Sequence, residues 1–146
     1  MKLDPLFKIN NNKLYKISDN SQVELSSLKK IELPWSKLEL EPENYNEELL
    51  AKLRDDLKEM ETTETFAIIV PIVDKPFTNE EDEESFVAAC NHAARRIKDC
   101  TSVVGFEIPA EVKDIQNFAD TLAIKHAQYI YFTQQENTLT DRVITY

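Results

Sequence analysis

The chain has 146 residues, which is close to the usual size of one domain, so we expect a single domain over 1–146. Its 27 acidic and 17 basic residues give a net charge of −10, which argues against binding to nucleic acid or to an anionic membrane surface. The sequence contains one glycine, Gly105, which excludes the glycine-rich phosphate-binding loops of P-loop, dinucleotide-binding and kinase folds.

Residues 6–28 are predicted to form short strands separated by turns. Three apolar segments alternate with two clusters of Asn, Asp and Ser, at 10–12 and 19–21. Asn and Asp tolerate positive φ, so these clusters can turn the chain without glycine. We therefore expect an N-terminal hairpin or small meander.

From residue 30 onward the pattern alternates between strand and helix. We expect four strands and three helices, at 30–35 (strand), 46–60 (helix), 66–73 (strand), from the Thr78-Asn79-Glu80-Glu81 capping box to about 99 (helix), 103–108 (strand), 112–127 (helix) and 129–132 (strand). The run 66–73 is apolar throughout, which is typical of strands buried on both faces of a parallel sheet.

Residues 142–146 are a further candidate strand. The nine residues before it, 133–141, are fewer than the dozen or so of a parallel crossover. We therefore expect this strand to be antiparallel or to lie outside the main sheet.

These elements predict an α/β fold, with a hairpin at 6–28, a βαβαβαβ core at 30–132 and a C-terminal extension at 133–146. Parallel crossovers are right-handed, so neighbouring strands would place all three helices on one face. The other face stays bare unless the sheet curls. A curled sheet with helices outside is part of a (β/α)₈ barrel, and four units are half of one. We expect a half-barrel-like, four-stranded parallel sheet.

The stretch from Ile31 to Leu50 resembles the second strand, and the loop and helix after it, of cellulase- and mannanase-type glycoside hydrolases of clan A. These enzymes are (β/α)₈ barrels. Residues 66–74 are similar to their third strand and 104–111 to their fourth, which ends in an Asn-Glu pair whose Glu is the catalytic acid/base. The resemblance covers about residues 6–132, and it implies that Glu111 is the general acid/base.

The sequence departs from this family where the chemistry would be. Glu32 stands where the family has an Arg, and Ala110 stands where it has the Asn before the acid/base. The later strands, which carry the second catalytic carboxylate, have no counterpart. The resemblance therefore implies a truncated, degenerate relative.

Four carboxylates are expected at the rim formed by the carboxyl ends of the strands: Glu32, Asp74, Glu107 and Glu111. Retaining glycoside hydrolysis needs two carboxyl groups about 5–5.5 Å apart. Glu107 and Glu111 share a parity along the strand, so they are the catalytic candidates, although Pro109 can break the register. Alternatively, Glu111 is an ordinary carboxylate at a helix N-terminus, since a single acid cannot hydrolyse a glycoside by this route.

Aromatic residues near strand ends are candidates for a sugar-stacking platform or, alternatively, for the core: Trp35, Tyr45, Tyr129 and Tyr131. Together with Asp74 and Glu32, Trp35 is a candidate ligand-binding residue.

Other reactive side chains lack the spacing that a metal or redox site requires. The carboxylates of 80–84 would point in different directions on a helix, and His92 and His126 have no ligand-spaced partners. Cys90 and Cys100 match no metal or redox pattern and are expected to be reduced thiols. We expect neither a metal nor a cofactor.

The first functional hypothesis is a non-catalytic, glycosidase-like half-barrel that acts by self-association or partner binding. Two copies of a four-stranded sheet would give the eight strands of a closed barrel, so we predict a homodimer. One alternative is a carbohydrate hydrolase with Glu111 as acid/base and a site completed across a dimer. Another is a carbohydrate-binding module. The polar N-terminus predicts a cytoplasmic location, unless a signal peptide has been removed.

Overall fold

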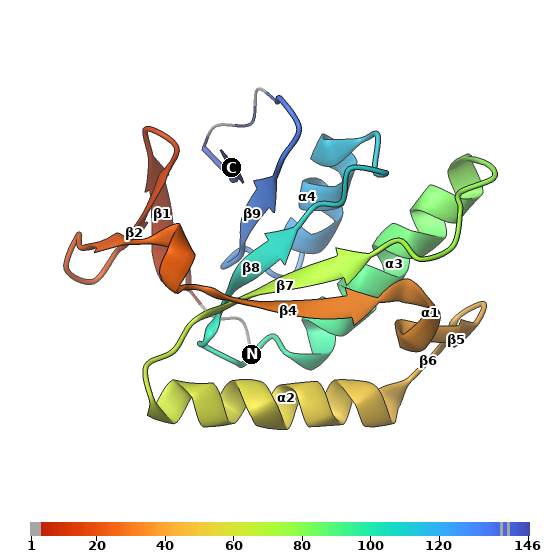
Figure 1. The fold of residues 1–146 in the computed structure, drawn as a ribbon, viewed down its shortest axis with the longest axis horizontal. Helices are drawn as coiled ribbons and strands as arrows, with labels where there is room; N and C mark the ends of the chain where they lie inside the picture. The colour runs from red at the N-terminus through yellow and green to blue at the C-terminus, as the bar shows by residue number, and fades with distance from the viewer. Residues whose placement is uncertain (1–3, 138, 140) are drawn as a thin grey trace.

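A computed structural model describes residues 4–137, 139 and 141–146. Five parallel strands form the main sheet, in the order β10 (Val143–Thr145), β9 (Ile130–Thr133), β8 (Val103–Glu107), β7 (Ala67–Ile72) and β4 (Lys29–Pro34). Three helices connect β4 to β9 in turn: α2 (Glu47–Thr62), α3 (Glu80–Arg96) and α4 (Ile115–Ala123). The expected α/β half-barrel-like fold is confirmed, with a fifth parallel strand added (Figure 1).

The smaller elements surround this sheet. An antiparallel sheet is formed by β1 (Phe7–Asn10), β2 (Lys13–Lys16) and β3 (Gln22–Val23). The 3-10 turn η1 (Leu25–Ser27) follows it, and the short helix α1 (Trp35–Leu38) follows β4. A two-stranded ribbon is formed by β5 (Glu39–Glu41) and β6 (Asn44–Tyr45). The first of these sheets is the expected N-terminal meander. The segment from α1 to β6 was expected to be loop.

The prediction that the last strand is antiparallel, or outside the sheet, is wrong. Residues Val143, Ile144 and Thr145 pair in parallel with Tyr131, Phe132 and Thr133. A parallel connection usually needs a dozen or more residues, because it contains a helix and runs back along the full length of a strand. Here the two strands have four and three residues, so the return path is only about 10–13 Å at ~3.3 Å per residue, and nine residues cover it.

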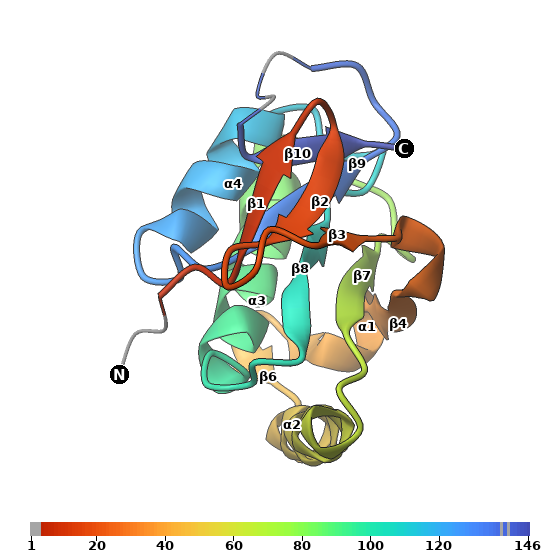
Figure 2. The ribbon, with the colours of Figure 1, turned by 90° about the vertical axis from the view of Figure 1, so that its left-hand side faces the viewer.

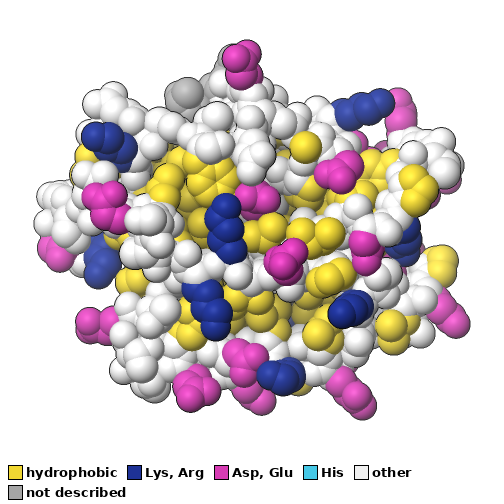
Figure 3. All heavy atoms as spheres, viewed as in Figure 1, with side chains coloured by type: hydrophobic (Ala, Val, Ile, Leu, Met, Phe, Trp, Pro, Cys, Tyr) yellow, Lys and Arg dark blue, Asp and Glu magenta, His cyan; other side chains and the backbone are white. Residues whose placement is uncertain are grey.

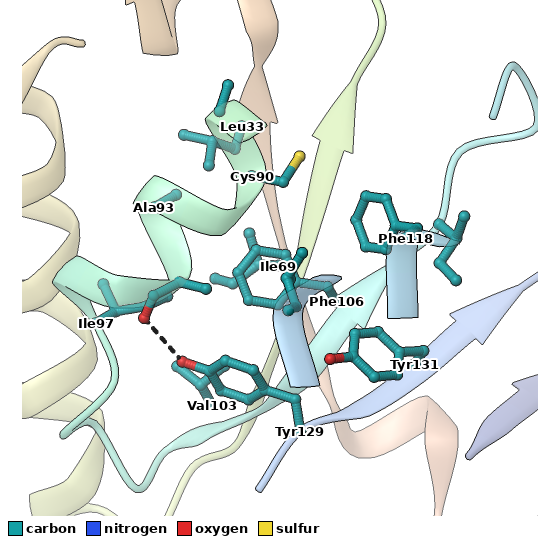
Figure 4. Packing of buried hydrophobic residues seen from close by; sticks show 14 of the residues in the cluster. Leu33, Ile69, Cys90, Ala93, Ile97, Val103, Phe106, Phe118, Tyr129 and Tyr131 are labelled. Atoms are coloured by element: carbon teal, nitrogen blue, oxygen red, sulfur yellow. Dashed lines mark hydrogen bonds between the residues drawn. The ribbon is translucent and has the colours of Figure 1, made fainter. Parts of the chain in front are cut away.

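The helices cover one face of the sheet. Their buried side chains pack against alternate residues of the strands, including Leu33, Ile69, Phe106 and Tyr131 (Figure 4). Side-chain oxygens of Asn46, Asn79 and Asp114 accept the backbone N–H three residues on and so begin the three helices. The N-cap of α3 is therefore Asn79, one residue after the expected Thr78. Helices α3 and α4 both end earlier than expected.

The N-terminal meander covers the opposite, concave face of the sheet. Phe7, Leu14 and Val23 form a second buried cluster with strand residues such as Val104 and Phe132. Figure 2 shows β1 and β2 lying across the sheet, with α3 and α4 behind it. The expectation of a bare second face is therefore wrong for the part of the sheet that the meander covers.

Asparagines make the tight turns of the meander, as expected without glycine. Asn11, Asn12 and Asn20 have positive φ angles of 52°, 61° and 58°. Asn12 also joins the meander to the far edge of the sheet, because its amide donates to the carbonyl of Thr145 (2.6 Å) and accepts from the N–H of Thr145 (2.8 Å). The side chain thus satisfies both backbone groups of the edge strand, as a neighbouring strand would.

We expect Asn12→Gly to destabilise the protein by about 1–2 kcal/mol, because two hydrogen bonds at the sheet edge are lost while positive φ is still tolerated. The Thr145 amide should exchange faster with deuterated solvent. Asn11→Gly is the matched control, since Asn11 has a similar φ and makes no side-chain hydrogen bond among the described residues. Equal stability and equal Thr145 exchange in the two variants would rule out this role for Asn12.

Two contacts characterise the strand geometry. Lys30 on β4 lies 4.4 Å above the ring of Tyr146, which directly follows β10, although these edge strands would lie about 19 Å apart in a flat sheet. This contact indicates that the sheet is curled.

Gly105 lies where β8 and β9 approach closely, because a Cβ placed on it would be 1.6 Å from the carbonyl oxygen of Ile130.

Among the residues that the structure describes, no helix combines the length and the hydropathy that crossing a membrane requires.

Candidate functional site

A groove opens at the carboxyl ends of β7 and β8. Its volume is about 1310 Å³. We call it the α3–α4 groove. It is lined by the loop after β7 (73–79), one side of the first three turns of α3, the loop after β8 and the start of α4. The lining includes Val73, Asp74, Lys75, Phe77, Glu80, Glu83, Glu84, Val87, Ala88, Asn91, Glu111, Lys113, Asp114 and Asn117.

Two carboxylates of the groove stabilise its walls. Glu83 accepts the backbone N–H of Lys113 (2.9 Å) and of Asp114 (3.3 Å), which joins α3 to the loop before α4. Asp74 accepts the N–H of Ser36 at 3.0 Å and also its hydroxyl, so it caps the short helix α1 from the loop after β7. Burial acts to raise the pKa of Asp74, but the hydrogen bonds from Ser36 outweigh it and the pKa is lowered.

Three other carboxylates of the groove are unengaged. The side chains of Glu80, Glu84 and Glu111 are exposed, and none of them makes a hydrogen bond or ion pair with another described residue. Lys75, one of the two cations of the groove, lies 4.1 Å above the ring of Trp35. The groove therefore presents surplus negative charge to solvent.

A separate polar cluster lies on the concave face, and we call it the Lys30–Glu107–Tyr146 cluster. The hydroxyl of Tyr146 donates to the carboxylate of Glu107, and Lys30 approaches that carboxylate at 3.8 Å. Burial and the Glu107 carboxylate raise the pKa of Tyr146, so its hydroxyl remains protonated and donates. Figure 3 shows this face of the molecule, where Lys, Arg, Asp and Glu side chains lie among hydrophobic side chains.

The structure places the two catalytic candidates on different surfaces. Glu107 is the last residue of β8 and belongs to the concave-face cluster, whereas Glu111 lies in a turn after the strand and lines the α3–α4 groove. The shared parity does not bring them together, because the strand ends at Glu107 and Pro109 lies between them. Glu32 is exposed on the edge strand β4. Of the four rim candidates, Asp74 and Glu111 share the groove.

Trp35 lies in the core at the start of α1. It is 3% exposed, and its ring packs edge-on against Phe77 and Phe86. Its indole N–H donates to the buried Glu39 at 2.8 Å, and Glu39 also accepts the N–H of Glu43 at 3.0 Å. The indole has no open face on which a sugar ring could stack.

The remaining aromatic candidates also have protein partners. Tyr129 and Tyr131 are buried against the helices, and Tyr129 donates to the carbonyl of Ala94 at 3.2 Å (Figure 4). Tyr45 stacks on His92 with 4.2 Å between ring centroids. We find no exposed platform formed by the four predicted aromatic residues.

Both cysteines are free and buried, as expected. Burial raises the pKa of Cys100 to about 11 and that of Cys90 further, so neither is a reactive thiolate at neutral pH. Within the described ranges, no group of three or more His, Cys, Asp or Glu side chains is placed to hold a metal ion.

Sequence reasoning missed Glu39, Lys30 and Tyr146. Lys30 and Tyr146 lie 116 positions apart, and neither belongs to a recognisable motif. Glu39 was indistinguishable from its exposed acidic neighbours, although its spacing of four residues from Trp35 was a usable signal for a local hydrogen bond.

Comparison with known proteins supports the fold. No protein-family model and no curated protein sequence matches the chain. A search of solved structures finds a chain described as a GH5_18 from Bifidobacterium longum subsp. infantis, with a TM-score of 0.55 and 10% sequence identity. The match covers 80% of this chain and 37% of that one. This protein therefore shares the fold of about a third of that chain.

Proposed function

We propose that this chain is a non-catalytic, glycosidase-like partial barrel that acts by binding a protein partner. The proposal starts from the shared fold with a glycoside hydrolase structure, which by itself carries no activity to a chain of 10% identity. One observation carries it further: Glu107 and Glu111 lie on different surfaces, so these two catalytic candidates do not form a pair.

The surroundings of Glu107 support this proposal. A nucleophile or general acid must be able to reach a substrate. The Glu107 carboxylate accepts a hydrogen bond from Tyr146 and pairs with Lys30, and the side chain is 16% exposed. A sugar would have to displace both partners to reach it. Glu111 is accessible, but Glu107, its expected partner in the retaining reaction, lies on another surface.

The sequence predicts a homodimer that closes an eight-stranded barrel, but the structure weakens the geometric reason for it. The sheet has five strands, so two copies would contribute ten. The meander already buries much of the concave face that a second copy was expected to cover. We therefore favour a partner other than a second copy.

A hydrolysis assay tests the proposal. We expect no release of product from aryl β-glycosides or β-linked polysaccharides above the buffer rate. The parent, Glu107→Gln and Glu111→Gln should be indistinguishable. A known β-glycosidase, assayed in parallel, shows that the substrates are competent.

Two results would count against this assignment. Hydrolysis by the parent that Glu111→Gln abolishes would make the chain an enzyme. A dimer in sedimentation at micromolar concentration would restore self-association as its mode of action, whereas a single monomer peak is expected.

A further inference from the structure

We infer that the α3–α4 groove binds a basic peptide segment of a partner protein, with apolar side chains in the groove and Lys or Arg side chains at its acidic rim. This inference rests on the proposed function, since it names the chemistry of the partner. It commits to a polypeptide rather than to a small cation.

The size and lining of the groove favour a peptide. A volume of about 1310 Å³ exceeds the ~300–1,000 Å³ of most small-molecule sites. Val73, Phe77 and Ala88 supply apolar lining from two different elements, and Val87, which is 3% exposed, adds little accessible surface. A groove of this kind accepts alternate side chains of a bound segment, which is how proteins commonly recognise peptides.

The charge of the groove selects a basic partner. Six carboxylates and two lysines line it: Asp74, Glu80, Glu83, Glu84, Glu111 and Asp114 against Lys75 and Lys113. Asp74, Glu83 and Asp114 already accept backbone N–H groups of the protein, and Lys75 stacks on Trp35. Three carboxylates, those of Glu80, Glu84 and Glu111, and one ammonium group, that of Lys113, have no partner among the described residues. The charge that a ligand would meet in the groove is therefore negative.

The N-termini of α3 and α4 both face this region and would by themselves attract an anion. However, Asn79 caps α3, Asp114 caps α4 and Glu83 takes two N–H groups before α4. The protein's own side chains therefore occupy one backbone donor at the start of α3 and three at and before the start of α4, which leaves fewer for an anionic ligand.

Asn91 provides an unused acceptor in the lining of the groove. Its side-chain oxygen is buried and has no hydrogen-bond partner among the described residues. A buried acceptor without a donor is unfavourable, and native structures contain few of them. On this inference, the Asn91 side chain turns toward the groove when a peptide binds, and a backbone amide or ammonium group of the peptide donates to its oxygen.

Fluorescence anisotropy with a short fluorescein-labelled peptide of alternating lysine and leucine tests this inference. We expect saturable binding that weakens as salt is raised, because exposed charges are screened. Three control probes define the chemistry: a peptide with glutamate for lysine, a peptide with serine for leucine, and spermine as an unlabelled competitor. The first two should bind at least about tenfold more weakly, and spermine should compete poorly.

Ala88→Lys is the decisive variant, because Ala88 is exposed and lines the groove, and lysine is compatible with a helix. The new side chain should fill the groove and repel the peptide, with at least about tenfold weaker binding. Ser85→Lys adds the same charge to an exposed position of the same helix outside the groove lining, and it should bind like the parent.

Charge removal is tested with matched triple variants. Glu80→Gln with Glu84→Gln and Glu111→Gln should weaken binding about tenfold at low salt. Removing three carboxylates from exposed positions of α2, with Glu48→Gln, Asp55→Asn and Glu59→Gln, should have a smaller effect at the same net charge.

The outcomes separate this inference from the proposed function. No binding of the lysine–leucine peptide, equal binding by Ala88→Lys and Ser85→Lys, or full competition by spermine would each overturn the groove as a peptide site. None of these results would restore catalysis, which the hydrolysis assay tests separately.

Discussion

Gly105→Ala is expected to destabilise the protein by about 4 kcal/mol or more, or to prevent it from folding. The added Cβ would lie 1.6 Å from the carbonyl oxygen of Ile130 and 2.6 Å from its carbonyl carbon. Backbone of a paired strand cannot move aside as a flexible side chain can. Strands β8 and β9 would therefore have to separate at the centre of the sheet.

Val104→Ile is a suitable control, because it also adds one carbon to β8 but directs it at side chains of the buried hydrophobic cluster between the meander and the sheet. We expect a loss of about 1 kcal/mol. Urea unfolding of both variants measures the comparison. A Gly105→Ala protein within about 1 kcal/mol of the parent would show that β8 and β9 are not as close as described.

Trp35→Ala is expected to cost about 3–5 kcal/mol, because it removes a buried indole from its contacts with Phe77 and Phe86. The change also leaves the Glu39 carboxylate without the indole donor. Trp35→Phe, which retains most of the packing, should cost about 1–3 kcal/mol through the lost hydrogen bond. Thermal or urea unfolding measures both losses.

Leu40→Ala is the control for Trp35, since Leu40 lies in the adjacent ribbon and is 57% exposed; it should change stability by less than about 0.5 kcal/mol. Trp35 is the single tryptophan, so its fluorescence also reports on ligands. We expect no change when oligosaccharides are added. A saturable change in emission, together with a stable Trp35→Ala protein, would return Trp35 to a sugar-binding role.

The regular part of the fold was predictable because local patterns determine it. The leucine stripe of α2 and the apolar run of β7 each identify their element within a residue or two. Asn-rich turns were predictable for the same local reason. The cover on the concave face was not, because it depends on where the meander packs after the sheet has formed. The parallel direction of β10 depended on strand lengths, which the sequence leaves uncertain by a residue or two.

The candidate site was less predictable than the fold. Alternation along a strand predicts which residues share a face, but it fails where the strand ends, and Glu111 lies beyond that point. The groove is formed by two loops and two helices, and its free carboxylates differ from the engaged ones only in their partners. Glu83 and Glu84 are adjacent in sequence, yet one holds a loop in place and the other faces solvent.

The hydrogen bonds between Asn12 and Thr145 join residues 133 positions apart. Closing so long a segment carries a large entropic cost, which the chain must meet before the contact contributes anything. The meander is synthesised before β10, so its anchor on β10 can form only after that strand has been synthesised. We therefore expect the nascent protein to expose the apolar side of β1 and β2 until the strands that they cover have been synthesised.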